Sequence, residues 1–86
     1  MYYTYVLLSE KDEEFYIGFT EDLRERLKKH KTGKVKSTAN RRPFKLIYYE
    51  ACLGRQDATK REQYFKTGYG RRFLKNRLES FLDTVE

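Results

Sequence analysis

Two basic side chains fall on a stripe of the sequence that a helix would turn inward. Arg26 and His30 follow Leu23 at spacings of three and seven residues, so all three share one face of a helix. Leu27 lies on the same stripe, which is therefore half apolar and half basic. Charged side chains are rarely buried without a partner, so these two either reach water from the edge of the stripe or face a polar site. Spacing alone favours the first interpretation.

Glu62 poses the same question on another expected helix. It follows Ala58 by four residues and precedes Phe65 by three, so it shares their inward face. A carboxylate in that position needs a cation, which can be a basic side chain or a metal ion. For an isolated glutamate, an ion pair is the more common solution. The basic partners available in the sequence are Arg61, Lys66 and Arg26.

Two tyrosines on either side of a short polar turn are candidate proton acceptors. Tyr5 and Tyr16 belong to aromatic and β-branched segments that the turn would pair as a hairpin. A phenol has a pKa of about 10 and becomes a useful base only where nearby positive charge favours the phenolate. Arg26, His30 and a metal ion on Glu62 are the groups that would supply this charge. Ordinary packing in a sheet is the alternative for either tyrosine.

The elements that must position these residues follow from periodicity and turn chemistry. Aromatic and β-branched runs predict strands, and apolar residues three and four apart predict helices. Thr20 is expected to cap the first helix, and Gly68 and Gly70 are expected to separate the second from the third. The order β-β-α-β-α-α predicts an α/β (α+β) fold, a small three-stranded antiparallel sheet flanked by helices. The predicted elements are strands at 2–8, 15–19 and 44–50 and helices at 21–31, 57–67 and 71–83.

Basic residues are concentrated between the first helix and the third strand. Segment 31–42 has little apolar content and is predicted to be a loop. The whole chain carries a formal net charge of +6, with a pI of about 9.5. This balance favours a polyanionic partner such as nucleic acid or an anionic membrane surface. Many small proteins are simply basic, so charge alone does not decide between partners.

Length and cysteine content narrow the class of protein. The 86 residues are expected to form one domain, 1–86, with a modest core rich in aromatic residues. The single cysteine, Cys52, excludes an internal disulfide and a cysteine-based zinc site, and is expected to be a small buried residue. No apolar run is long enough to span a membrane, so a reducing, cytoplasmic location is expected.

Several segments together resemble the GIY-YIG nuclease superfamily. The second half-motif is intact at residues 16–18 as Tyr-Ile-Gly. The first, at 3–5, reads Tyr-Thr-Tyr and keeps the catalytic tyrosine position without the leading glycine. Segments 22–30, 42–48 and 58–66 also look like the family, in the same order and at the same spacing. The chain is most similar to small single-domain members, which resemble the N-terminal nuclease domain of a DNA-repair excinuclease.

The resemblance implies a set of catalytic residues. Glu62 would hold one divalent metal ion, Mg²⁺ or in its place Mn²⁺, with water completing the coordination. Tyr5, or alternatively Tyr16, would take a proton from the attacking water. Arg26 would bind the phosphate and stabilise its added negative charge. His30 would orient a tyrosine or assist proton movement.

The resemblance also implies that basic side chains contact the nucleic-acid backbone, which gives affinity without sequence recognition. Lys66 would touch phosphate or tune the site, and Asn76 is the candidate for a polar residue that the family often carries late in the domain. Ordinary solvated surface is the alternative for these clusters. The expected nucleic-acid contacts are Lys34, Lys36, Arg41, Arg42, Lys66, Arg71, Arg72 and Asn76.

Three functions are consistent with these residues. The first is a metal-dependent endonuclease that hydrolyses phosphodiester bonds in DNA, in repair or recombination, with a homodimer or a partner protein if both strands are cut. The second is a catalytically inactive nucleic-acid binding module on the same fold. The third is a protein-interaction domain that uses its aromatic surface. The sequence retains all the catalytic candidates, which favours the enzyme.

Overall fold

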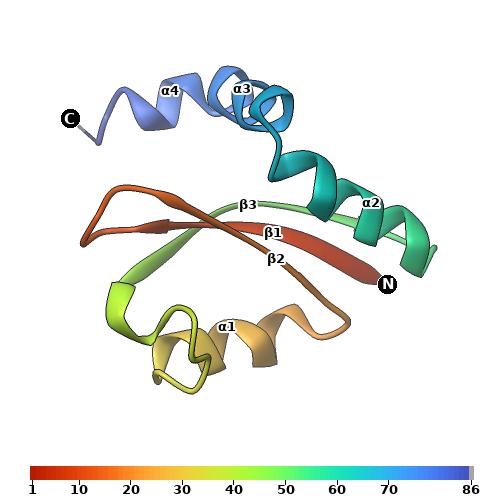
Figure 1. Ribbon diagram of the computed structural model, residues 1–86, viewed down its shortest axis with the longest axis horizontal. Helices are drawn as coiled ribbons and strands as arrows, with labels where there is room; N and C mark the ends of the chain where they lie inside the picture. The colour runs from red at the N-terminus through yellow and green to blue at the C-terminus, as the bar shows by residue number, and fades with distance from the viewer. Residues whose placement is uncertain (86) are drawn as a thin grey trace.

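The computed structural model describes residues 1–85 and contains a three-stranded antiparallel sheet between two layers of helix (Figure 1). The strand order is β2-β1-β3, so the first strand of the chain is central and the other two are edges. A short turn joins β1 to β2 in the antiparallel hairpin that the sequence predicts. The strands are β1 (Tyr2–Ser9), β2 (Phe15–Thr20) and β3 (Phe44–Cys52).

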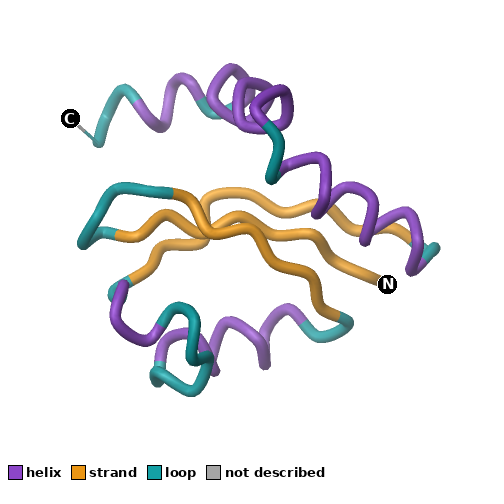
Figure 2. The backbone as a smooth tube through the Cα atoms, in the orientation of Figure 1, coloured by secondary structure: helices purple, strands orange, loops and turns teal. Residues whose placement is uncertain are grey.

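Helices cover both faces of the sheet (Figure 2). The helix α1 (Leu23–Lys31) covers one face, while α2 (Arg55–Phe65) and α3 (Gly68–Arg77) cover the other. A 3₁₀ turn, η1 (Ala39–Arg41), precedes β3, and the short helix α4 (Glu79–Leu82) follows α3. The predicted α+β class and β-β-α-β-α-α order are confirmed, with α4 as an addition. Within residues 1–85, no helix has both the length and the apolar character needed to cross a membrane.

Side chains alternate along β1, which gives the two faces of the sheet different chemistry. On the side of α2, Val6 and Phe65 belong to the hydrophobic core. Thr4 on the same side donates a hydrogen bond of 2.8 Å to the carbonyl oxygen of Ala58, which fixes α2 on the sheet. On the side of α1, Tyr5 meets a polar side chain instead. The hydrophobic core and the predicted polar residues of β1 and α1 therefore lie on opposite faces.

Both helices of the second layer begin earlier than predicted, at Arg55 and Gly68. The prediction that Gly68 and Gly70 separate the helices is wrong, because both lie in the first turn of α3. Thr67 caps that turn, since its hydroxyl accepts the N–H of Gly70 at 3.1 Å. The chain is interrupted further on, between α3 and α4, where a single helix was predicted over 71–83.

Asp22 caps α1 in place of the predicted Thr20. The carboxylate of Asp22 accepts the N–H of Glu25 at 3.1 Å, which is the usual N-cap geometry. The hydroxyl of Thr20 accepts the N–H of Asp22 at 3.1 Å, so it supports the capping residue rather than the helix itself.

The segment between α1 and β3 is anchored to the fold, whereas the sequence predicts a loop with little apolar content. Val35 and Thr38 in this segment are buried. Arg41 forms an ion pair with Asp12, with a Nε–Oδ2 distance of 2.7 Å. Arg42 donates to the carbonyl oxygen at the end of α1 at 3.3 Å. These contacts tie the segment to the β-hairpin and to α1.

Two glycines of α3 provide a matched test of this packing. A Cβ on Gly70 would lie 2.6 Å from the Cα of Phe65 and would overlap the backbone at the end of α2, whereas a Cβ on Gly68 would meet nothing within 4 Å. We expect Gly70→Ala to lower the free energy of unfolding by about 2 kcal/mol or more. We expect Gly68→Ala to be neutral or to stabilise by up to about 1 kcal/mol. Urea denaturation followed by circular dichroism measures both, and equal effects would contradict the α2–α3 contact.

Candidate active site

A buried hydrogen bond joins the central strand to α1. Tyr5 has no exposed surface, and its hydroxyl lies 2.7 Å from Nε2 of His30. Arg26, one turn earlier on the same helix, donates from Nε to the same oxygen at 3.4 Å. Arg26 and His30 therefore face a polar site, and the inward stripe predicted for α1 is confirmed.

Gly18 makes room for the Tyr5 phenol. Tyr5 and Gly18 are direct partners in the antiparallel pairing of β1 with β2, so they share a face of the sheet. A Cβ on Gly18 would overlap Cζ and Oη of Tyr5. The absence of a side chain lets the phenol ring lie over the edge strand and point its oxygen toward α1. This contact gives a steric reason for the glycine in the Tyr-Ile-Gly segment.

Tyr16 stands beside this cluster and is more accessible than Tyr5. Its ring centroid lies 5.1 Å from that of His30 and 6.4 Å from that of Tyr5. Tyr16 is half-buried, so solvent reaches it in the structure. The hydrogen bond to Tyr5 is the largest of the causes that raise the pKa of Arg26, and a hydrogen bond to Tyr16 adds to it. Arg26 therefore serves both phenols.

His30 is neutral and has a partner at each ring nitrogen. Its Nε2 faces Tyr5, and its Nδ1 lies 2.8 Å from Oγ1 of Thr38. Burial, followed by the charge of Arg26, lowers the pKa of His30 from 6.5 to about 4. His30 does not supply the positive charge that the sequence led us to expect, and offers a neutral proton acceptor instead. Nothing in a polar segment marks which hydroxyl will reach His30, so Thr38 is found only in the structure.

The phenol of Tyr5 is protonated in this environment. Burial is the largest cause that raises the pKa of Tyr5, and the charges of Tyr16 and Glu62 add to it. The hydrogen bond and charge of Arg26 act in the opposite direction but do not outweigh burial. Tyr5 can therefore act as a base only if its own proton has somewhere to go.

Glu62 lies on α2, in the helix layer that covers the other face of the sheet. Its side chain is 19% exposed and forms an ion pair with Lys66, with a distance of 3.4 Å between Nζ and Oε2. Within residues 1–85, no hydrogen bond joins Glu62 to the tyrosines, Arg26 or His30. Its charge nevertheless contributes to the raised pKa of Tyr5, so the two groups interact electrostatically.

A metal ion at Glu62 would have few ligands from the protein. The part of the chain that the structure describes contains no group of three or more His, Cys, Asp or Glu side chains that could hold an ion. Mg²⁺ is often held by one or two carboxylates, with water and substrate phosphate filling the remaining positions. A single partly buried carboxylate fits that mode and does not fit a structural zinc site.

The predicted nucleic-acid contacts divide between the two helix layers. Lys34 and Lys36 are exposed beside the C-terminal end of α1. Arg41 and Arg42 are held by intramolecular contacts, with Asp12 and with backbone carbonyl oxygens, respectively. The exposed members on the other layer are Lys66, Arg71, Arg72 and Asn76.

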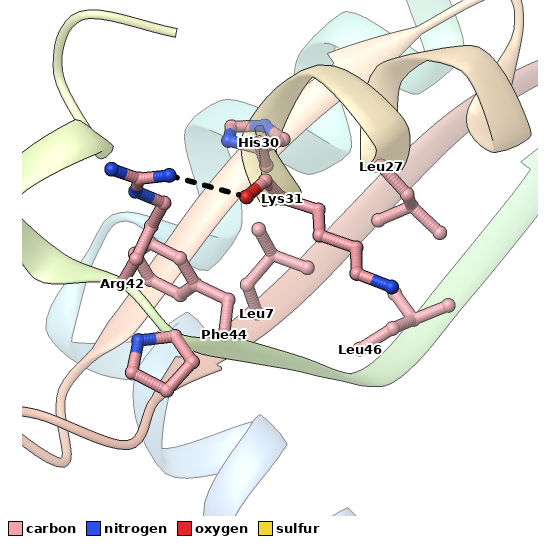
Figure 3. Close-up of a pocket in the computed structure, with 8 residues that line it drawn as sticks. Leu7, Leu27, His30, Lys31, Arg42, Phe44 and Leu46 are labelled. Atoms are coloured by element: carbon pink, nitrogen blue, oxygen red, sulfur yellow. Dashed lines mark hydrogen bonds between the residues drawn. The ribbon is translucent and has the colours of Figure 1, made fainter. Parts of the chain in front are cut away.

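A cavity of about 630 Å³ opens beside the cluster on the α1 side (Figure 3). Its walls are mostly apolar and include Leu7 from the sheet and Leu27 from α1. Lys31 and Arg42 place positive charge at its rim, and His30 also lines it. The cavity thus adjoins the Tyr5 cluster through His30.

These features define the class of the protein. The chain belongs to the GIY-YIG family, because residues 1–77 match the GIY-YIG catalytic domain. This is a family of nucleases that act on nucleic acid. The three-stranded sheet, the Tyr-Ile-Gly segment on β2 and the paired tyrosines agree with that membership.

The similar proteins belong to one group of small members. A UPF0213 protein of Lacticaseibacillus paracasei is 46% identical over 66 residues, which cover 76% of this chain and 73% of that protein. A UPF0213 protein of Clostridium perfringens is 42% identical over 67 residues, covering 77% of this chain and 71% of that protein. The solution NMR structure of a UPF0213 protein from Bacillus halodurans is 35% identical, with a TM-score of 0.55 over 94% of this chain and 85% of that one.

The buried neutral state of His30 predicts a specific pH dependence of stability. The unfolded chain binds a proton at His30 below pH 6.5, while the folded protein resists it down to about pH 4. Stability from this residue is therefore complete above the unfolded pKa and is lost as pH falls through this window, by roughly 3 kcal/mol. His30→Gln removes the titration and should flatten this part of the curve, because the carboxylates are common to both proteins. Urea denaturation from pH 7 to 4 measures the difference, and parallel curves would contradict the buried, neutral histidine.

Proposed function

We propose that this protein is a metal-dependent endonuclease that hydrolyses phosphodiester bonds in DNA. The observation that carries the proposal is the cluster of Tyr5, Arg26 and His30, with Tyr16 at its open side. A phenol, a guanidinium and a neutral imidazole in hydrogen-bond contact are suited to take a proton from water and to bind a phosphate. Membership of the family supports the reaction class.

The proton of the attacking water moves in two linked steps. Tyr5 accepts it while its own proton passes to Nε2 of His30, 2.7 Å away. The water oxygen bonds to phosphorus, the bond from phosphorus to the leaving oxygen breaks, and that oxygen takes a proton from solvent. The low pKa of His30 makes its imidazolium short-lived, so the proton returns to Tyr5 and then to solvent.

Arg26 controls access to Tyr5 in this scheme. Its 3.4 Å contact with the phenol oxygen is long for a hydrogen bond, and a phosphate is a stronger partner for a guanidinium. When Arg26 turns to the phosphate, the oxygen of Tyr5 gains a free lone pair beside the half-buried Tyr16. Bound phosphate also brings negative charge that favours the imidazolium of His30.

Glu62 is the residue that would hold Mg²⁺ or Mn²⁺. Its present partner, Lys66, is half exposed and can be replaced by a hydrated ion at little cost. A bound ion supplies charge neutralisation at the phosphate. Glu62 and the tyrosine cluster belong to opposite layers, but β2 is an edge strand. A phosphate seated beyond that edge can be reached from both layers.

The same arrangement supports binding of a DNA backbone across the edge of β2. Lys34 and Lys36 would contact phosphates on the α1 side, and Arg71 and Arg72 would contact them on the α3 side. These contacts are exposed and carry no base readout, so affinity should fall steeply with salt. Repair or recombination in the cytoplasm is the context we propose, with a homodimer or partner protein for cuts in both strands.

Cleavage of linear, nicked, flapped and branched DNA with Mg²⁺ tests the proposal. We expect the wild-type protein to cut at least one substrate and expect Glu62→Gln and Arg26→Ala to slow cutting at least 100-fold, because each removes stabilisation of the phosphate charge. Glu21→Gln and Arg55→Ala are matched controls, since this exposed pair lies outside the cluster. They should cut at the wild-type rate.

Two results would overturn the proposed function. Wild-type protein that binds DNA in a salt-dependent way but cuts no substrate with Mg²⁺ or Mn²⁺ would show the inactive binding module instead. Protein that neither binds nor cuts DNA would favour the interaction domain. Wild-type rates in Glu62→Gln would remove the metal role from Glu62.

A further inference from the structure

Thr38 is buried beside the candidate active site and is not assigned a role by the mechanism above. It has no exposed surface, although it lies in a segment rich in basic residues between α1 and β3. Its Oγ1 lies 2.8 Å from Nδ1 of His30 and 3.3 Å from the carbonyl oxygen of Val35. A hydroxyl has one proton to donate, so these two contacts fix its direction.

The carbonyl oxygen of Val35 can only accept, so it takes the proton of the Thr38 hydroxyl. The oxygen of Thr38 is then left as an acceptor for His30, and this assigns the imidazole proton to Nδ1. The other ring nitrogen, Nε2, carries a lone pair and accepts the proton of Tyr5. A single directed chain of hydrogen bonds therefore runs from Tyr5 through His30 and Thr38 to Val35.

The opposite tautomer would block the proposed chemistry. With a proton on Nε2, His30 would donate to Tyr5 and could not receive the proton that Tyr5 must lose. Because Tyr5 is protonated in its buried position, the tautomer of His30 decides whether the phenol can act as a base. His30 makes no other side-chain hydrogen bond within residues 1–85. Thr38 is thus the group that selects the tautomer.

We propose that Thr38 is a positioning residue that holds His30 in the Nδ1–H tautomer and so keeps Nε2 ready to take the proton of Tyr5. The tautomer follows from the hydrogen bonds alone, whereas its effect on cleavage rests on the proposed function. The residue acts through His30 and does not touch the phosphate.

The imidazole nitrogens of His30 can be observed directly, because it is the only histidine in the chain. In a long-range ¹H–¹⁵N spectrum of wild-type protein at neutral pH, we expect a pyrrole-type Nδ1 and a pyridine-type Nε2. Thr38→Val keeps the shape but removes the acceptor, so the proton should shift toward Nε2, where Tyr5 can accept it. Thr38→Ser should restore the wild-type spectrum. Thr32→Val is the matched control, since that exposed threonine bonds only backbone oxygens of α1.

Cleavage rates of the same variants complete the test. We expect Thr38→Val to cut DNA roughly 100-fold more slowly, as loss of a positioned proton acceptor implies, while Thr38→Ser and Thr32→Val cut at near the wild-type rate. A pyridine-type Nδ1 in wild-type protein, or an unchanged spectrum or rate in Thr38→Val, would overturn the proposal. If wild-type protein cuts no DNA, the proposed function fails while the spectra still decide the role of Thr38. If Thr38→Val does not fold, the wild-type and Thr38→Ser spectra decide it.

Discussion

The hydrogen bond between Tyr5 and His30 is the contact around which the α1 side of the molecule is organised. Its atoms lie 2.7 Å apart and both residues are almost completely buried, so breaking it would leave polar groups without partners. It requires Gly18 opposite Tyr5, because any side chain there would occupy the space of the phenol. It also requires α1 to present His30 toward the sheet. The strand pairing, the glycine and the helix face are therefore constrained together.

The sheet separates the residues that stabilise the fold from those that are available for chemistry. The apolar core, including Val6 and Phe65, lies on the α2 side of β1. The polar cluster lies on the other side, where neighbouring residues of the same strand point. Changes to the cluster can therefore alter the site without removing the hydrophobic contacts of the core. The exception is His30, whose buried neutral ring links the cluster to stability through pH.

Much of this arrangement could be predicted from the sequence because it depends on periodicity. The three-and-four spacing placed Arg26 and His30 on the inward face of α1, and the short turn paired the strands that carry Tyr5 and Tyr16. The contact between Thr38 and His30 could not be predicted, since it joins two segments whose relative position is set by tertiary packing.

Two further features could not be predicted from local patterns. The helical use of Gly68 was missed because a cap at Thr67 outweighs the usual tendency of glycine to end helices. The placement of Glu62 and the tyrosines in opposite layers depends on which face of the sheet α2 covers. Helical periodicity identifies the inward face of a helix but not the side of the sheet on which that helix packs.

The most direct test of the proposed chemistry is the rate at which Tyr5→Phe cuts DNA in a single turnover with Mg²⁺. This substitution removes one oxygen and keeps the ring over Gly18, so the protein should fold and bind DNA as before. We predict a loss of roughly 100-fold or more in the cleavage step, with Tyr16→Phe affected less. A Tyr5→Phe protein that cuts at the wild-type rate would show that the buried phenol takes no part in the reaction.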